Sequence, residues 1–452
     1  MGIGGIGMSG IAKVLAAQGY RISGCDLDLE QKSVKQLQKL GCTISHGHDS
    51  VACHDPSIDV VVYSTAVHTD HPELARTRAA GKRTIHRSVM LAELMRTKYS
   101  IAVSGAHGKT TTTSLIAHIL LQTNQDPTVV IGGHLKNIDD NAHAGSGQLL
   151  VAEADESDRS FLRLPATWAV ITNIDLEHLD TYKDLPDIIA TFKQFLCQLP
   201  FYGKAIVCLD DPVIKSLFPL PDIATITYGL DDQATVYARD IELLAEHSTC
   251  TVYMRGEQLG KLMIPIAGRH HLLNALGATA LALDVGLSFG DIAQALATFQ
   301  GVERRFSYHG KFHGAEIFDD YGHHPCEIAH TLSVARKRAK GRVHVVFQPH
   351  RFTRTHLLWN DFIDTFMRSN IDTLVLTDIF PASEEAIEGV TSQRLVEDLA
   401  QRKPRFAATY IPLDSNFAQL IANVKEHAQP GDLVLFLGAG KVYQIPELLE
   451  LE

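Results

Sequence analysis

The chain has 452 residues, which is too long for a single ordinary core and predicts about three domains. An apolar fraction of 45% and a charged fraction of 21% are typical of a soluble globular protein, and no apolar run approaches the roughly 18–20 residues of a membrane span. The net charge of −11 argues against non-specific nucleic-acid binding, which requires a basic surface.

The seven cysteines are scattered and are never spaced C-x-x-C, which argues against a disulfide framework and against a structural zinc site. The first residues, Met1–Gly5, lack the basic segment that begins a secretory signal. We therefore expect a cytoplasmic protein in a reducing compartment.

The first stretch of alternating helical and β patterns covers residues 1–93 and opens on a glycine-rich loop. The spacing Gly2-x-Gly4-Gly5-x-Gly7-x-x-Gly10 leads into an amphipathic helix and then into a short strand that ends at Asp26. This order is typical of a dinucleotide fold, in which a pyrophosphate lies at the helix N-terminus and an acid binds a ribose. The strand that should precede the loop is missing, because the chain begins inside the loop. The diphosphate of a sugar nucleotide fits such a loop equally well.

The second stretch, residues 94–303, contains the strongest local signal. An apolar strand at 100–103 runs into a glycine loop with Lys-Thr-Thr at its end, and a helix is expected at 114–120. Backbone N–H groups of such a loop face a polyphosphate, while Lys109 reaches the β- and γ-phosphates and Thr110 can ligate Mg²⁺. The spacing departs from the usual phosphate loop, since Val103 stands where the first glycine would be. The predicted nucleotide-binding residues are Gly105, Ala106, His107, Gly108, Lys109, Thr110 and Thr111.

Acidic residues follow the next two apolar strands of this stretch. Glu153–Asp158 comes after the strand at 149–152, and Asn173–Asp180 follows the strand at 168–172. Because the carboxyl ends of parallel strands meet at one edge of a sheet, we expect these side chains beside the phosphate loop. Mg²⁺ takes oxygen ligands and needs only one or two carboxylates beside the phosphates. We therefore predict a metal site here, with His178 as the ligand of a second ion.

The third stretch, residues 304–452, is expected to carry strands at 342–347, 373–376 and 432–436. Two polar clusters, at 319–325 and 348–354, follow apolar strands. In the second cluster Arg351 and Arg354 are three residues apart, and guanidinium groups can bind a carboxylate through paired hydrogen bonds. The pattern indicates a carboxylate clamp. Surface ion pairs at the start of a helix are the alternative explanation.

Together these motifs make the chain resemble the Mur ligase family along its whole length. The resemblance is carried by residues 2–10, 107–113, 153–158, 268–270, 319–325 and 348–351, which are particularly like those of the branch that adds L-alanine. It implies an α/β fold with three domains. These are a Rossmann-like UDP-sugar domain (1–93), a central P-loop ATPase-like domain with a mainly parallel sheet (94–303) and a Rossmann-like amino-acid-binding domain (304–452).

The resemblance also implies roles for individual residues. It assigns the UDP-sugar to Gly4, Gly5, Gly7, Asp26 and Thr65, and the adenine side of ATP to Asn274. It gives the metals to Thr110, Glu153 and His178, and the amino acid and reacting carboxylate to Tyr321, His323, His350, Arg351 and Arg354. The residues that it implies to be catalytic are Lys109, Glu153, His178, His323, Arg351 and Arg354.

Three positions depart from the family pattern. His271 follows Gly-Arg-His where Asn is usual, Arg159 follows Glu-Ser-Asp where Gly or Ala is common, and Lys441 replaces the Asp of Gly-Ala-Gly-Asp. Many sister ligases carry a carbamylated lysine in the central domain, and the chain resembles the alanine-adding branch in having no evident equivalent.

The implied activity is ligation of L-alanine to the lactoyl carboxylate of UDP-N-acetylmuramate through an acyl phosphate, with ATP and two Mg²⁺ ions, as in peptidoglycan precursor synthesis. A ligase that recycles murein tripeptide is the second possibility, although its N-terminal loop pattern differs. An NAD-dependent dehydrogenase would leave the phosphate loop unused, and a nucleotide-binding switch would leave the Arg/His cluster near position 350 unused. A folate polyglutamate ligase would give no reason for the N-terminal glycine loop.

Overall fold

The computed structural model of the chain describes residues 1–47, 55–178, 181–220, 222–382 and 384–452. Helices alternate with strands, and most strand pairs are parallel, which confirms the predicted α/β class. The chain forms two compact units. The first comprises Met1–Glu242, Ser248–Pro265 and Arg269–Gly301, and the second comprises Leu243–His247, Ile266–Gly268 and Val302–Glu452. Within the described ranges, no helix is long and apolar enough to span a membrane.

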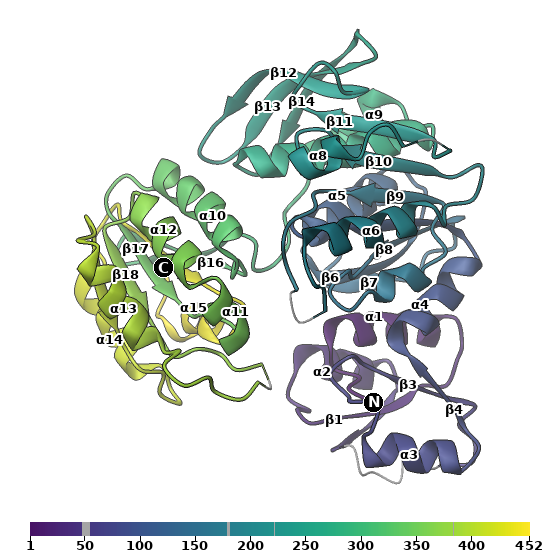
Figure 1. Ribbon diagram of the computed structural model, residues 1–452, viewed down its shortest axis with the longest axis horizontal. Coiled ribbons are helices and arrows are strands. Elements are labelled where there is room, and N and C mark those ends of the chain that lie inside the picture. Colours follow the sequence, from purple (N-terminus) through teal and green to yellow (C-terminus); the bar gives the residue numbers. More distant parts are fainter. Residues whose placement is uncertain (48–54, 179–180, 221, 383) are drawn as a thin grey trace. The chain divides into compact units, whose positions relative to one another are not determined.

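Among its described residues, the N-terminal part of the first unit contains two short parallel strand pairs and the helices α1 to α4 (Figure 1). Its elements are α1 (Ile6–Ala17), β1 (Ser23–Asp26), α2 (Lys32–Lys39), β2 (Thr43–His46), β3 (Val60–Tyr63), α3 (Pro72–Ala79), β4 (Arg83–His86) and α4 (Arg87–Arg96). Strands β1 and β2 form one parallel pair, and β3 and β4 form another. The segment at 1–3 joins the two pairs: the Gly2 amide donates to the Cys25 carbonyl, and the Met1 amino group donates to the Val62 carbonyl.

One ten-stranded sheet forms the central part of the first unit, in the order β14-β13-β12-β11-β10-β9-β5-β8-β6-β7 (Figure 1). Its strands are β5 (Tyr99–Ser104), β6 (Thr128–Leu135), β7 (Asp140–His143), β8 (Leu149–Glu153), β9 (Trp168–Ile171), β10 (Lys204–Cys208), β11 (Thr225–Gly229), β12 (Val236–Leu243), β13 (Ser248–Met254) and β14 (Glu257–Ile264). Its helices are α5 (Lys109–Gln122), η2 (Ser160–Arg163), α6 (Leu185–Leu196), α7 (Pro212–Ser216), α8 (Arg269–Asp284) and α9 (Phe289–Ala297).

Three neighbouring parallel strands, β9, β5 and β8, position the predicted nucleotide site. Val103 of β5 is in register with Glu153 of β8, and Ser104 is in register with Ile171 of β9. The residues that follow the three strands therefore meet at one edge of the sheet, as the sequence predicts. Helix α5 begins at Lys109 rather than near Ser114, because Gly108 adopts a left-handed conformation and ends the loop directly before the lysine.

The second unit contains a six-stranded sheet in the order β15-β16-β20-β17-β18-β19. Its strands are β15 (Ser307–Phe312), β16 (Ala315–Asp320), β17 (Val343–Phe347), β18 (Thr373–Leu376), β19 (Ala407–Tyr410) and β20 (Leu433–Leu437). Its helices are α10 (Pro325–Arg338), α11 (Phe352–Leu357), α12 (Trp359–Arg368), α13 (Ser392–Gln401), α14 (Ala418–His427), η3 (Val442–Gln444) and α15 (Ile445–Leu448).

Successive side chains along the strands of the second unit point to opposite faces of the sheet, and both faces are apolar. On β20, Leu433, Leu435 and Leu437 pack into one core cluster, while Val434 and Phe436 pack into another on the opposite face. Both faces are covered by helices, which is typical of a sheet made mainly of parallel strands. Strands β16, β20 and β17 are parallel, so the polar segments after β16 and β17 lie at the same edge of the sheet.

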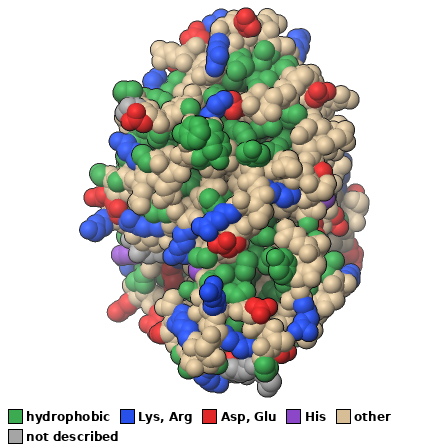
Figure 2. Space-filling model, turned by 90° about the vertical axis from the view of Figure 1, so that its right-hand side faces the viewer, with side chains coloured by type: hydrophobic (Ala, Val, Ile, Leu, Met, Phe, Trp, Pro, Cys, Tyr) green, Lys and Arg blue, Asp and Glu red, His purple; other side chains and the backbone are tan. Residues whose placement is uncertain are grey.

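On the face drawn in Figure 2, hydrophobic, basic and acidic side chains are interspersed. The described cysteines are all free, and Cys53 lies outside the described residues. The predicted domain limits at 93 and 303 stay predictions.

Candidate active site

The loop between β5 and α5 has the geometry of a polyphosphate cradle. Gly105 and Gly108 have φ angles of 134° and 80°, which a residue without a Cβ adopts at little cost. A Cβ at Gly105 would lie 2.2 Å from the Thr172 hydroxyl, and one at Gly108 would lie 2.7 Å from Oδ1 of Asn274. Asn274, which was predicted to contact ATP, thus lies directly beside the loop. The first N–H groups of α5 also lie at the loop, where they can bind an anion.

Asn173, which follows β9, holds this loop; its segment was expected beside the loop, but no role of its own was predicted for Asn173. Its Oδ1 accepts a hydrogen bond from the His107 amide at 2.8 Å, and its Nδ2 donates to the His107 carbonyl at 2.9 Å. The Thr172 hydroxyl donates to the same carbonyl at 2.5 Å. The only signal in the sequence is the position of Asn173 just after an apolar strand.

Two of the predicted metal ligands contact each other. The Thr110 hydroxyl donates to the Glu153 carboxylate, at 3.2 Å from Oε1 and 3.0 Å from Oε2. The Gly132 amide donates to Oε2 at 2.9 Å, and a Cβ at Gly132 would lie only 2.6 Å from this oxygen. Burial raises the pKa of Glu153. A partly buried carboxylate whose pKa is raised fits a divalent cation, because the cation would restore the charged form.

Lys109 is held at the loop by carbonyl groups and by a second glutamate. Its Nζ lies 2.8 Å from Oε1 of Glu156 and donates to the carbonyls of Gly105 at 2.6 Å and Ala106 at 3.1 Å. Burial alone would lower the pKa of Lys109, but the negative charges of Glu156, Glu153 and Asp155 outweigh burial, so the pKa is raised. The lysine is therefore a fixed cation at the phosphate loop.

Glu156 and Glu177 connect His178 with the phosphate loop. His178 Nε2 lies 3.3 Å from Oε1 of Glu156 and 3.5 Å from Oε2 of Glu177, and His107 Nε2 lies 3.1 Å from Oε1 of Glu177. Within the part of the chain that the structure describes, Oε2 of the buried Glu156 has no hydrogen-bond partner. Carboxylate oxygens and an imidazole thus gather beside Lys109, which is a donor set that fits a second metal ion. Sequence reasoning missed Glu156 and Glu177 as individual site residues.

The predicted sugar-nucleotide residues lie around the N-terminus of α1. Gly4 and Gly5 precede the helix and Gly7 is its second residue. Oδ2 of Asp26 accepts a hydrogen bond from the Gly4 amide at 2.8 Å, so that Asp26 fixes the glycine loop from the end of β1. A Cβ at Gly4 would lie 2.8 Å from Cγ2 of the buried Val34, which explains why a glycine is needed there.

Arg87, which sequence reasoning missed, links Thr65 to the same glycine loop. A Cβ at Gly7 would lie 3.2 Å from Nη1 of Arg87, and Nε of Arg87 donates to the Thr65 hydroxyl at 3.2 Å. Nη2 of Arg87 lies 2.7 Å from Oδ2 of Asp155. Burial would raise the pKa of Asp155, but the charges of Arg87 and Lys109 outweigh it and lower the pKa to about 2. The Thr65 hydroxyl also donates to Asp158 at 3.2 Å.

The positions that depart from the family pattern have structural partners. Arg159 Nη2 lies 2.5 Å from Oδ2 of Asp187, and its guanidinium lies 4.6 Å from the centre of the Tyr182 ring. His271 is buried, with its ring 3.9 Å from the ring of His270. The amide of Lys441 donates to Oε1 of Gln348 at 2.5 Å.

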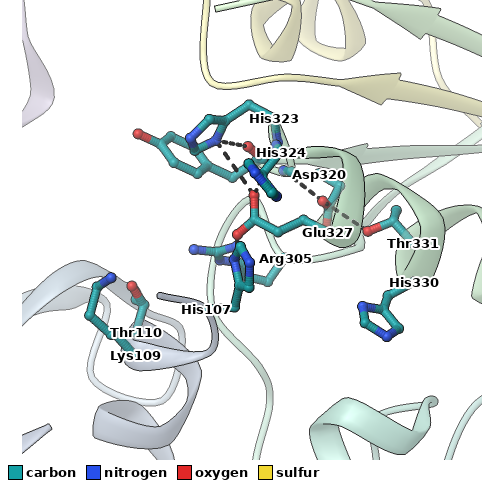
Figure 3. Close-up of polar contacts among 12 residues, drawn as sticks. His107, Lys109, Thr110, Arg305, Asp320, His323, His324, Glu327, His330 and Thr331 are labelled. Atoms are coloured by element: carbon teal, nitrogen blue, oxygen red, sulfur yellow. Dashed lines mark hydrogen bonds and ion pairs between the residues drawn. The ribbon is translucent and has the colours of Figure 1, made fainter. Parts of the chain in front are cut away.

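In the second unit, the segment after β16 is fixed by two acidic residues, Asp320 and Glu327 (Figure 3). Asp320 accepts hydrogen bonds from the Phe306 amide, the Gly322 amide and the Thr331 hydroxyl, at 2.8, 2.7 and 3.1 Å. Burial raises the pKa of Asp320 to about 6. Glu327 accepts from the His323 amide at 3.1 Å, which fixes the turn that precedes α10.

His323 and His350, two predicted amino-acid-binding residues, are close to each other. Their ring centres are 5.6 Å apart, and Nδ1 of His323 lies 3.0 Å from the Tyr321 carbonyl. Burial lowers the pKa of His323 to about 3 and that of His350 to about 4, so both imidazoles are neutral at pH 7. Arg354 Nη1 lies 3.4 Å from Nδ1 of His350, whereas Arg351 Nη1 lies 3.6 Å from Oε1 of Glu384.

Arg304 was also missed by sequence reasoning. Its guanidinium lies 4.7 Å from the ring centre of Tyr321 and 4.1 Å from that of Tyr443, and Nη2 donates to the Gly438 carbonyl at 2.9 Å. Arg304 therefore joins the segment after β16 to the loop after β20. The second unit thus presents arginines, neutral histidines and a tyrosine at one edge of its sheet, a set suited to a carboxylate and an amine.

Comparison with known proteins matches all three parts of the chain. Residues 1–99 match the "Mur ligase family, catalytic domain", residues 103–282 the "Mur ligase middle domain", and residues 304–440 the "Mur ligase, glutamate ligase domain". These matches confirm the predicted three-domain fold.

Curated relatives cover nearly the whole chain. The chain is 48% identical over 451 residues to the UDP-N-acetylmuramate–L-alanine ligase of Syntrophotalea carbinolica. This alignment covers 99% of this chain and 96% of the relative. It is 46% identical over 448 residues to the enzyme of the same name from Syntrophus aciditrophicus, covering 98% and 91%.

Solved structures give a consistent result. The UDP-N-acetylmuramate-alanine ligase of Thermotoga maritima has a TM-score of 0.81 at 26% identity, covering 99% of this chain and 96% of that one. A murein peptide ligase of Psychrobacter arcticus has a TM-score of 0.73 at 22% identity, covering 99% and 97%, which shows the fold alone.

Proposed function

The chain belongs to the Mur ligase family, and we propose that it joins L-alanine to the lactoyl carboxylate of UDP-N-acetylmuramate while converting ATP to ADP and phosphate. The observation that carries this proposal is the contact at the edge of the central sheet. Thr110 of the phosphate loop bonds to Glu153, and Lys109 of the same loop pairs with Glu156. A dehydrogenase would have no use for this arrangement, and the curated relatives bear the name of the proposed activity.

The proposed reaction has two steps. An oxygen of the lactoyl carboxylate attacks the γ-phosphorus of ATP, the bond to ADP breaks, and an acyl phosphate forms. The amine of L-alanine then attacks the acyl carbon, phosphate leaves with the bonding electrons, and the nitrogen loses its proton. Both steps bring anionic groups together, so cations must offset the repulsion between them.

We assign ATP to the phosphate loop at Gly105–Thr111, with Asn274 beside it. Lys109 and the N–H groups at the start of α5 bind the phosphates. Thr110 and Glu153 would hold one Mg²⁺ ion and His178, beside Glu156, would hold a second. The ions would neutralise phosphate charge and polarise the γ-phosphate for attack. The partly buried carboxylate of Glu153, whose pKa is raised by burial, and the orphan oxygen of Glu156 support this assignment.

We assign the amino acid and the reacting carboxylate to the edge of the second unit's sheet. Arg351 and Arg354 supply the positive charge for a carboxylate. His323 donates through Nδ1 to the Tyr321 carbonyl, which leaves Nε2 as a hydrogen-bond acceptor for an amino group. His350 is neutral as well, so the cationic charge at this edge comes from the arginines.

The proposed substrates are small molecules, and we place the reaction in the cytoplasm, where ATP is available. Recycling of murein tripeptide is the alternative within the family. The structure of that type is less similar in both fold and sequence than that of the alanine-adding type.

The test is an assay of phosphate release with ATP, Mg²⁺, UDP-N-acetylmuramate and one amino acid at a time. We expect release that depends on L-alanine, and a product heavier than UDP-N-acetylmuramate by one alanine residue. Glycine and L-serine serve as controls for strictness. Release that needs a murein tripeptide instead, or that needs no amino component, would contradict the proposal.

A further inference from the structure

Arg304, near the start of the second unit's long C-terminal segment, contacts two aromatic rings from different loops. Its guanidinium lies 4.7 Å from the ring centre of Tyr321 and 4.1 Å from that of Tyr443. Tyr321 belongs to the segment after β16, whereas Tyr443 belongs to η3, which follows the loop after β20. A guanidinium is attracted by the negative face of each ring. One side chain therefore holds two loops at the same edge of the sheet.

The backbone of Arg304 reaches the same tyrosine. Its φ angle of 58° lies in the left-handed region, which is unfavourable for a residue with a Cβ. Its carbonyl accepts a hydrogen bond from the Tyr321 amide at 2.7 Å. A conformation of this kind persists only where the surrounding contacts impose it. Arg304 thus holds Tyr321 twice, through the ring and through the amide.

The charge of Arg304 is bound to carbonyl groups rather than to a carboxylate. Nη2 donates to the carbonyls of Gly438 at 2.9 Å and Gly440 at 3.4 Å. Among the described residues, Nε has no hydrogen-bond partner and no carboxylate pairs with the guanidinium. Arg338 of the same unit has the more usual arrangement, since it lies 5.0 Å from the ring centre of Phe318 and also pairs with Glu316 at 3.0 Å.

A purely structural tie between the two loops is the simpler explanation. An apolar side chain, however, would pack against two tyrosine rings without the cost of removing a guanidinium from water. Packing alone therefore gives no reason for an arginine here. The same edge of the sheet is where we assign the amino acid and the reacting carboxylate, and Tyr321 belongs to that assignment. A cation without a carboxylate partner keeps its charge available for anionic ligands at this edge.

We propose that Arg304 is a positioning residue for amino-acid binding, which acts by holding Tyr321 against the loop after β20 before the amino acid arrives. This inference rests on the proposed function and deepens it at the amino-acid site. The loop itself is a firm anchor, because the Gly438 amide donates to the Asp320 carbonyl at 3.0 Å and the Lys441 amide donates to Oε1 of Gln348 at 2.5 Å. A side chain that is ordered in advance costs less entropy when the ligand binds.

The test compares Arg304→Met with Arg338→Met in steady-state kinetics of phosphate release. Arg338 also contacts an aromatic ring, but its partner Glu316 is near the start of β16, whereas Tyr321 follows the end of that strand. Its removal therefore controls for the loss of a partly buried guanidinium from this unit. We expect Arg304→Met to raise KM for L-alanine by about 10-fold, the size of one desolvated cation–π contact, and to leave KM for ATP unchanged. Arg338→Met should leave both KM values unchanged.

A double-mutant cycle with Tyr321→Leu shows whether Arg304 acts through the tyrosine. If it does, adding Arg304→Met to Tyr321→Leu raises KM for L-alanine no further, because the group that Arg304 positions is already absent. Effects of the two substitutions that multiply would overturn the inference, since Arg304 would then act independently of Tyr321.

Arg304→Lys keeps the charge but lacks the planar fork that contacts the rings and the Gly438 carbonyl. Its KM for L-alanine should lie between those of the unmodified protein and Arg304→Met, and it replaces Arg304→Met in the cycle if that variant does not fold. If the unmodified protein releases phosphate with L-alanine, an unchanged KM for L-alanine in these variants, or an equal rise of KM for ATP, overturns this inference alone. If the unmodified protein does not, the proposed function fails and takes the inference with it.

Discussion

Lys109 combines two tasks at the phosphate loop, since it pairs with Glu156 and also donates to two carbonyls of the loop. Removing this cation leaves the transferred phosphate without a fixed positive charge. We expect Lys109→Ala to lower kcat by about 10²- to 10³-fold, measured by phosphate release. Lys215→Ala, at an exposed position on α7, is the matched control and should retain full activity. Normal turnover by Lys109→Ala would remove the assignment of this loop to ATP.

The raised pKa of Asp320 predicts how the stability of the protein depends on pH. Its pKa is raised by burial to about 6, so the folded state favours the protonated carboxyl more than the unfolded state does. The stability that Asp320 contributes is therefore fully present below about pH 4 and is lost as the pH rises through 6.

We expect the free energy of unfolding of the unmodified protein to fall by up to about 3 kcal/mol, relative to Asp320→Asn, between pH 4 and pH 7. Urea unfolding at four pH values measures this difference. Asp361→Asn, at an exposed position on α12, should follow the unmodified protein. Parallel curves for the unmodified protein and Asp320→Asn would show that Asp320 titrates normally.

Individual side chains also mark the limit of what the sequence can predict. The glycine loop, the phosphate loop and the Arg/His cluster follow from local spacing, because each motif is continuous in the chain. Arg87 and Arg304 were missed, and Asn173 was given no individual role, because their roles depend on contacts with residues far away in the sequence. Periodicity carries no information about which strands become neighbours, and so none about these contacts.

At the scale of elements, the strands were predicted well where apolar β-branched residues are continuous, as in β5 and β17. The antiparallel pairs β6–β7 and β13–β14 at the two ends of the central sheet were not predicted. Buried parallel strands contain continuous apolar runs, whereas antiparallel strands with one solvated face include polar residues and therefore lack such a run. The start of α5 was placed too late, because the left-handed Gly108 lets the helix begin directly at Lys109.

A buried lysine fixes the position of α1, the helix that follows the glycine loop. Lys13 is 6% exposed, and its Nζ donates to Oε1 of Gln36 and Oδ1 of Asn141, both at 2.8 Å, and pairs with Asp140 of β7. We expect Lys13→Met to lower the free energy of unfolding by roughly 1–3 kcal/mol, because it leaves these acceptors without their donor. Lys13→Met also removes the ion pair between α1 and β7, and the predicted sugar-nucleotide residues lie at the N-terminus of α1. KM for the sugar nucleotide should therefore rise more than KM for ATP.

Chemical denaturation and steady-state kinetics measure the two effects of Lys13→Met. Lys39→Met, at an exposed position on α2, is the control for loss of a lysine. An equal rise of both KM values would show general loosening of the first unit rather than a specific effect on α1.

At the scale of the whole molecule, the two compact units have separate cores. A ligand that binds one folded unit protects the backbone of that unit against opening. We expect a non-hydrolysable ATP analogue with Mg²⁺, at 100 times its Kd, to stabilise the strands around the phosphate loop by about 2.7 kcal/mol. Hydrogen exchange followed by mass spectrometry should show slower exchange in β5, β8 and β9, with little change in β17 and β20. Equal slowing in both sets would contradict the assignment of ATP to the first unit.

The pairing of β5 has a consequence for how the chain acquires activity. Ile101 pairs with Val151 on one side and with Trp168 on the other, and both partners lie far along the chain. Such distant parallel pairings form late, because the intervening segment must first be closed into a loop. A nascent chain that has emerged only as far as α5 already carries every residue of the Gly105–Thr111 loop, yet it has no Asn173 to hold that loop. Competence to bind ATP should therefore arise abruptly, only after β9 has been synthesised and has joined the sheet.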